Sequence, residues 1–210
     1  MFSFIENKRF FYACAALSVV VTVMSANLLS HSVVSIFGNV LIVIFLLLMI
    51  IFNRVEHKEL MKVLTASLLQ LVLGKNLAEY SAIIEPVFSD MKHALDFLNV
   101  NNITFRGITL IVTSVILLIL YINHFVINFT GKASKVAINI NKAVMTIYFL
   151  LVVVSKIGLV VTVSRNMPLY SAMPYKLQMS LIMNGIPTML YALTVVSMEA
   201  FVNKEREKKD

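Results

Sequence analysis

The stretch from Ala143 to Ser164 constrains this chain most, because its 22 residues are almost all apolar. A helix rises about 1.5 Å per residue, so it would reach about 33 Å and cross a hydrocarbon core of about 30 Å. Its one charged residue, Lys156, lies nine positions before Arg165 and hence about 13 Å from that end. A lysine this deep is expected to be paired or to face a polar surface, which makes Lys156 the first candidate site residue.

The composition predicts that the chain crosses a membrane several times. Hydrophobic residues make up 59% of the sequence and charged residues 14%, whereas a soluble domain carries about 25% charged residues. The longest interval rich in polar residues, Lys75 to Arg106, is 32 residues long, too short to bury a core of its own. We therefore expect an all-α bundle of transmembrane helices that forms a single integral membrane domain over residues 1–210.

The two N-terminal spans predict the orientation. An apolar run over Phe10–Leu29 is too long for an ordinary signal peptide and is expected to be retained as the first helix. A second helix over Val33–Phe52 follows a link, residues 30–32, that carries no lysine or arginine. The flanking cations are Lys8 and Arg9 on one side, and Arg54 and Lys58 on the other. The positive-inside rule therefore places the N-terminus in the cytoplasm.

The number of spans depends on the run Val63–Gly74, which has only 12 residues, or about 18 Å of helix. If it crosses, 12 flanking cations lie inside and five outside; if it lies flat or re-enters, the balance is 10 against seven. The charge balance favours crossing, which gives six spans rather than five and both termini inside. The net charge of +7 then reflects topology and contact with anionic lipids on the cytoplasmic face, with no nucleic-acid partner expected.

The other elements follow from their apolar patterns. Residues 83–99, with Pro86 in the first turn, are expected to form an amphipathic helix on the outer side. It would lie on the membrane surface or cap the bundle, as a structural element or as a lid over a pathway. The remaining expected elements are a loop at Asn99–Gly107, a helix at Ile108–Phe129, a cationic loop at Thr130–Lys142, an outer loop at Arg165–Lys176, a helix at Leu177–Val202 and a charged cytoplasmic tail at 203–210.

Two features of the first helices predict packing. Small residues recur at helical spacing in the first helix and are expected to form a packing seam: Ala15, Ser18, Thr22 and Ser25. Asn39 is the one strongly polar residue of the second helix, where we expect a hydrogen bond between helices.

The sixth helix is interrupted by the sequence from Asn184 to Pro187. Pro187 has no N–H, so the carbonyl of Met183 would lose its helical partner at about the depth of Lys156. We predict a polar intramembrane site around this carbonyl, which Ser155 and Tyr191 could extend: Lys156, Asn184, Met183, Pro187, Ser155 and Tyr191. In the alternatives, Pro187 only kinks the helix, and Lys156 reaches the outer headgroups or an acidic residue of a partner subunit.

Motifs for catalysis or for metal binding are missing from the sequence. The four histidines are scattered without metal-ligand spacing, and no nucleophile elbow or phosphate loop is present. The single Cys14 excludes an internal disulfide, and Glu199 is the only acid within a predicted span. We expect His124 to make a hydrogen bond at a helix interface, and we expect no catalytic residue, metal or cofactor.

These features favour a non-enzymatic, multi-pass subunit of an oligomeric or multi-protein membrane assembly of the channel, transport or secretion type. Its partners would be further copies of the chain or other membrane proteins. It would lie in a bacterial cytoplasmic (inner) membrane or a plasma membrane. A small stand-alone solute carrier and an intramembrane enzyme acting on lipid headgroups are the alternatives.

Overall fold

The computed structural model describes residues 3–29, 33–52, 57–89, 100–129, 135–165, 167–172, 175–183 and 185–207, and these contain helices and no strand. The helices are α1 (Lys8–Leu29), α2 (Val33–Ile51), α3 (Lys58–Ser89), α5 (Val100–Phe129), α6 (Lys135–Arg165), α7 (Met167–Ala172), α8 (Tyr175–Met183) and α9 (Ile186–Glu207). Five of them, α1, α3, α5, α6 and α9, contain apolar stretches long enough to cross a membrane, and α2 carries a shorter one over Ile36–Ile51.

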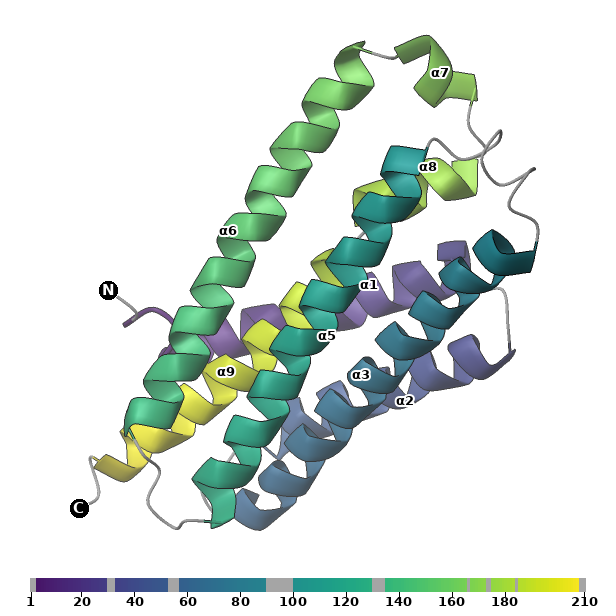
Figure 1. Cartoon of the computed structure of the whole chain (residues 1–210). Helices are drawn as coiled ribbons and strands as arrows, with labels where there is room; N and C mark the ends of the chain where they lie inside the picture. Colours follow the sequence, from purple (N-terminus) through teal and green to yellow (C-terminus); the bar gives the residue numbers. More distant parts are fainter. Residues whose placement is uncertain are drawn as a thin grey trace.

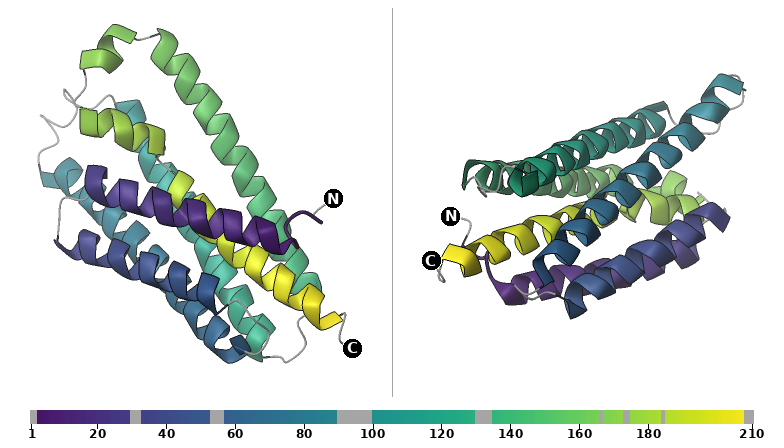
Figure 2. Two further views of the ribbon diagram at one scale, coloured as in Figure 1. Left: turned by 180° about the vertical axis from the view of Figure 1, so that it is seen from behind. Right: turned by 90° about the horizontal axis from the view of Figure 1, so that it is seen from below.

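The long helices run alternately up and down, and both chain ends lie at the same end of the bundle (Figure 1). Helix α9 lies in the middle, against α1 and α6, while α3 packs mainly on α5, and α2 on α1 and α3 (Figure 2). This arrangement leaves α9 with 67% of its spanning stretch buried, against 17% for α6. Helix α6 is therefore the least buried of the five spanning helices, and its outer half, the part after Val152, leans away from the bundle (Figure 1).

Small polar residues are buried inside the bundle beside its apolar core, and many large apolar side chains face outward, as expected where the solvent is lipid. Large apolar side chains such as Phe37, Val63 and Val154 are more than half exposed. Small polar residues of α1 and α9 are fully buried and meet each other. Ser18 Oγ lies 3.2 Å from Thr194 Oγ1, and the hydroxyls of Thr22 and Tyr191 lie 2.8 Å apart. The predicted small-residue seam of α1 is thus confirmed as the contact with α9.

Helix α3 is longer than its apolar run predicted, because polar residues beyond the run are satisfied inside the bundle. Lys75 Nζ donates to Asn39 Oδ1 on α2 at 2.6 Å, which confirms the interhelical hydrogen bond expected for Asn39. Asn76 Nδ2 donates to Thr113 Oγ1 on α5 at 3.0 Å. The spanning stretch of α3 therefore extends over Glu59–Leu77 rather than stopping at Gly74.

The structure differs from the expected boundaries in three places at the end of the bundle opposite the termini (Figure 1). Residues 83–89 are the last turns of α3, so no separate helix begins at Pro86; residues 90–99 lie outside the described residues. The loop expected up to Gly107 is helical from Val100, because a helix can continue into polar sequence once it leaves the hydrocarbon. The outer loop expected at Arg165–Lys176 contains the short helix α7.

The predicted sixth helix is divided in two, and its second part extends into the expected tail. Helix α8 ends at Met183 and α9 begins at Ile186, so the predicted interruption is confirmed. Helix α9 continues to Glu207, so residues 203–207 of the expected charged tail are helical, and Lys204 Nζ lies 3.2 Å from Glu6 Oε2.

Candidate functional site

Helix α6 changes character at Val152. Before it, buried residues recur every three or four positions and face α9 and α5: Ala137, Ile138, Asn141, Lys142, Met145, Tyr148 and Val152. After Val152, no side chain that the structure describes in α6 is buried. The inner half of α6 is thus a component of the core, while its outer half borders a groove.

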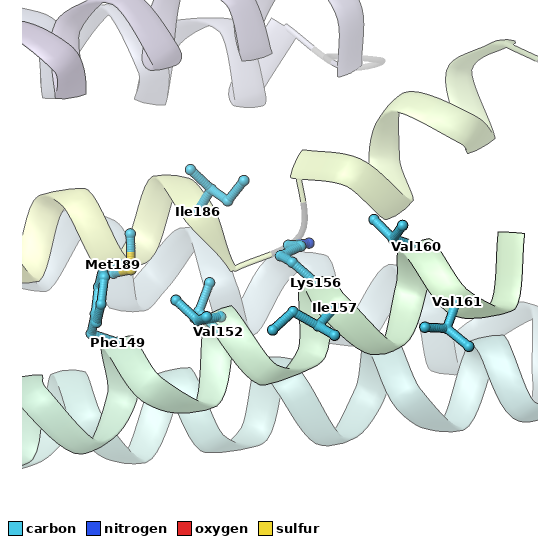
Figure 3. A pocket seen from close by; sticks show the side chains of 9 residues that line it. Phe149, Val152, Lys156, Ile157, Val160, Val161, Ile186 and Met189 are labelled. Atoms are coloured by element: carbon cyan, nitrogen blue, oxygen red, sulfur yellow. The ribbon is translucent and has the colours of Figure 1, made fainter. Parts of the chain in front are cut away.

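The groove encloses about 480 Å³ between α6 and the start of α9. Its walls are apolar apart from Lys156, and they comprise Phe149, Val152, Val153, Ile157, Val160 and Val161 of α6 with Ile186 and Met189 of α9. The Lys156 side chain points toward the place where α8 ends and α9 begins (Figure 3). A cavity of this size is in the range of small-molecule sites, and it would also admit side chains of a neighbouring helix.

A glycine makes the break between α8 and α9. Gly185 has φ of 77°, which a residue with a Cβ adopts only with strain. The Gly185 carbonyl accepts hydrogen bonds from the backbone N–H of Met189 (3.1 Å) and from Tyr148 Oη on α6 (3.2 Å). Pro187 lies in the first turn of α9, where a missing N–H costs no helical hydrogen bond. The helix thus ends before the proline instead of being kinked by it.

The structure brings together only part of the predicted site. Lys156 lies beside the break between α8 and α9 (Figure 3). Met183, the last residue of α8, and Pro187, in the first turn of α9, are half-buried. Ser155 Oγ donates to the Val152 carbonyl of its own helix, and the hydroxyl of Tyr191 lies 2.8 Å from that of Thr22 on α1. That these two residues extend the site stays a prediction. Asn184 lies outside the described residues.

Tyr148 is the site residue that the sequence analysis missed. It is 1% exposed, and its hydroxyl holds the carbonyl at the break from which α9 starts. A signal was present: Tyr148 precedes Lys156 by eight positions, about two helical turns, and so lies near the same face of α6.

A second buried polar cluster lies nearer the end of the bundle that carries the termini. His124 Nδ1 on α5 lies 2.5 Å from Glu199 Oε1 on α9, with side chains 4% and 6% exposed. Asn141 Nδ2 on α6 donates to Glu199 Oε2 at 2.9 Å, and Asn141 Oδ1 accepts from Asn123 Nδ2 on α5 at 2.8 Å. The expected interface role of His124 is confirmed, but its pairing with Glu199, 75 residues away in sequence, was not foreseen.

At the same end, Lys142 Nζ donates to Glu6 Oε1 at 2.6 Å. This hydrogen bond, and a weaker one from Lys204, hold the pKa of the Glu6 carboxyl below its ordinary value, although partial burial opposes them. Among the residues that the structure describes, no three histidine, cysteine or acidic side chains come close enough to hold a metal ion.

Comparison with protein-family models, with curated proteins and with solved structures gives no match to this chain. We therefore infer the function from the groove beside Lys156 and from the cluster around His124 and Glu199.

Proposed function

We propose that this chain is a non-enzymatic subunit of a membrane assembly of the channel, transport or secretion type, and that the groove beside Lys156 receives a transmembrane helix of a partner protein. The observation that carries the proposal is the outer half of α6, where the buried face ends at Val152 although the helix continues to Arg165. A neighbouring helix would complete the packing that α9 provides for the inner half.

Lys156 indicates the chemistry of the partner. Lys156 gives the otherwise apolar groove one positive charge, so a partner helix that carries a carboxylate at that depth would add a charge pair to the apolar contact. The acids within the described spans are Glu59 and Glu199, which bind Lys62 and His124. A second copy thus offers no carboxylate from these spans at the depth of Lys156, which favours a different protein that carries an acid in its span.

In this proposal the chain has six spans and both termini are cytoplasmic. The membrane is a bacterial cytoplasmic membrane or a plasma membrane. The positions of the termini at one end of the bundle support it (Figure 1). Cations of that end, such as Lys8 and Lys135, would face the anionic lipids of the cytoplasmic leaflet.

The test is to extract the chain gently from its own membrane, measure the native mass and identify what co-purifies. In one variant a photo-crosslinking residue replaces Val160, which faces the groove and is 66% exposed. In the control variant it replaces Phe37 on α2, which is 63% exposed. We expect one defined protein to be crosslinked from position 160 and only lipid from position 37. Lys156→Leu should abolish that crosslink, whereas Lys156→Arg should retain it.

A monomeric mass with lipid adducts alone at both positions would contradict the proposal. The helix break at Gly185 favours one second candidate, a stand-alone carrier, because interrupted helices line substrate sites in many transporters. Solute uptake by the purified chain in vesicles, without any partner, would select the carrier.

A further inference from the structure

The cluster around His124 joins four helices. Its ring lies between Glu199 on α9 and the backbone carbonyl of Lys62 on α3, which is 3.0 Å from Nε2. Through Asn141, the Glu199 carboxylate is also connected to α6, and Asn141 in turn bonds to α5. The cluster is therefore the point at which the inner half of α6 is attached by hydrogen bonds to both of its neighbours.

The hydrogen bonds around the ring can be completed in two protonation states. Nε2 faces a pure acceptor, the Lys62 carbonyl at 3.0 Å, and a donor, Asn128 Nδ2 at 2.9 Å. A protonated Nε2 donates to the carbonyl, and a bare Nε2 accepts from Asn128. Nδ1 can donate to Glu199 in both states. With Nε2 protonated, the ring is an imidazolium beside a carboxylate; with Nε2 bare, it is a neutral ring beside the same carboxylate. Both leave the ring fully bonded.

We propose that His124 and Glu199 form a buried proton-binding site, and that its proton occupancy sets how firmly α6 is attached to α5 and α9. With the proton bound, the charge of Glu199 is balanced by the imidazolium. When the proton leaves Nε2, Glu199 keeps the hydrogen bond from Nδ1 but loses the balancing charge, so the hydrogen bond from Asn141 carries more of the stabilisation of the carboxylate and draws the N-terminal end of α6 toward α9. The site takes a proton as its ligand, independently of any partner in the groove.

The charged groups around the site are already paired. On α3, Lys62 Nζ bonds to Glu59 at 2.7 Å. Lys142 on α6, next to Asn141, and Lys204 on α9 both bond to Glu6, which precedes α1. The carboxylates in these pairs reduce the electrostatic effect of the three lysines on the ring. Glu199 is the acid that contacts the ring directly.

A movement of α6 at Asn141 would be transmitted along the helix to the groove beside Lys156. Asn141 and Lys156 are 15 residues apart in one uninterrupted helix, a distance of about 22 Å. Because the outer half has no buried side chain among the described residues, a small tilt there would disrupt no core packing.

The first measurement is the protonation state of His124 in the full chain, reconstituted in lipid nanodiscs with isotope-labelled histidine. The ring nitrogen signals of His124 are identified by their loss in His124→Gln. We expect a reversible change between imidazolium and neutral ring as the pH is raised, and a displaced midpoint in Glu199→Gln. Glu59→Gln, in the exposed pair with Lys62, is the matched control and should leave the midpoint where it is.

The second measurement is the position of α6, by the distance between spin labels at Val160 on α6 and Val20 on α1, both exposed, in a Cys14→Ala background. We expect this distance to change over the same pH range as the His124 signals, and not in Glu199→Gln. Labels at Val20 and Ile44 on α2 should show no change. A His124 ring that keeps one state at every pH, or an unchanged distance across its titration, would overturn the proposal. Both tests can be decided in the otherwise unaltered chain if Glu199→Gln fails to fold.

Discussion

Ser18 shows why the seam of α1 needs a small side chain more than it needs a hydroxyl. Its Oγ already donates to the Cys14 carbonyl of its own helix at 2.7 Å, and its contact with Thr194 is the longer one at 3.2 Å. Hydrogen bonds between helices in membranes contribute only about 0.6 kcal/mol on average. Close packing therefore determines which residue is tolerated at this position.

Ser18→Ala should accordingly lower the unfolding free energy by less than about 1 kcal/mol. Ser18→Leu should lower it by about 1–3 kcal/mol, because the side chain is fully buried and α9 cannot move aside without losing contacts elsewhere. Reversible unfolding in mixed micelles measures both. The matched control is Val20→Leu, since Val20 faces outward, and an equal loss there would show that the seam has no special status.

Glu6 makes the stability of the chain depend on pH outside the membrane-spanning segments. Its pKa is lowered in the folded state, chiefly by the hydrogen bond from Lys142, so the stabilisation is complete above the ordinary value of 4.5. It is lost as the pH falls through the lower value of the folded state. Glu6→Gln should therefore destabilise the chain at neutral pH, and the difference from the unaltered chain should shrink in acid.

Unfolding at neutral and at acidic pH tests this. Glu59→Gln provides the control, because the Glu59 side chain is 80% exposed. If Glu6→Gln is as stable as the unaltered chain at neutral pH, the ion pairs with Lys142 and Lys204 do not contribute.

At the scale of elements, the break between α8 and α9 depends on the backbone of Gly185. Gly185→Ala places a Cβ at φ of 77°, which costs about 1–2 kcal/mol unless the backbone rearranges. We expect a loss of that size in unfolding free energy, together with a changed environment for Tyr148, whose hydroxyl bonds to the Gly185 carbonyl. Because the chain has seven tyrosines, the change is assigned to Tyr148 by comparing tyrosine fluorescence with and without Tyr148→Phe in the same samples.

Gly38 on α2 provides the contrasting substitution. A Cβ there would meet nothing within 4 Å, so Gly38→Ala should be neutral or stabilising by about 0.5–1 kcal/mol. Equal effects at the two glycines would show that the left-handed conformation of Gly185 is not what forms the break.

The elements also show what local sequence patterns could predict. Apolar runs located α1 and α2 to within two residues, and the proline and glycine at 185–187 located the break, because both signals are local. The runs failed at the outer end of α3 and the start of α5, where helices leave the hydrocarbon and polarity no longer marks their ends. The pairing of His124 with Glu199 depends on which helices are neighbours, and no spacing in the sequence contains that information.

At the scale of the whole molecule, the arrangement depends on whether α3 crosses. Its spanning stretch of 19 residues, Glu59–Leu77, is about 28 Å long, close to the thickness of the hydrocarbon core. If α3 crosses, Arg9 and Glu59 lie on one side of the membrane, and Met167 and Tyr175 on the other. If it does not, all four lie on the same side, because the later helices would be inverted.

Single cysteines at these four exposed positions, in a Cys14→Ala background, distinguish the two arrangements in intact cells. We expect a membrane-impermeant maleimide to label the cysteines at 167 and 175 at once, and those at 9 and 59 only after the cells are opened. Protection of all four would mean that α3 does not cross. The opening of the groove beside Lys156 would then lie toward the cytoplasmic leaflet, and the partner acid would have to be sought in that half of the membrane.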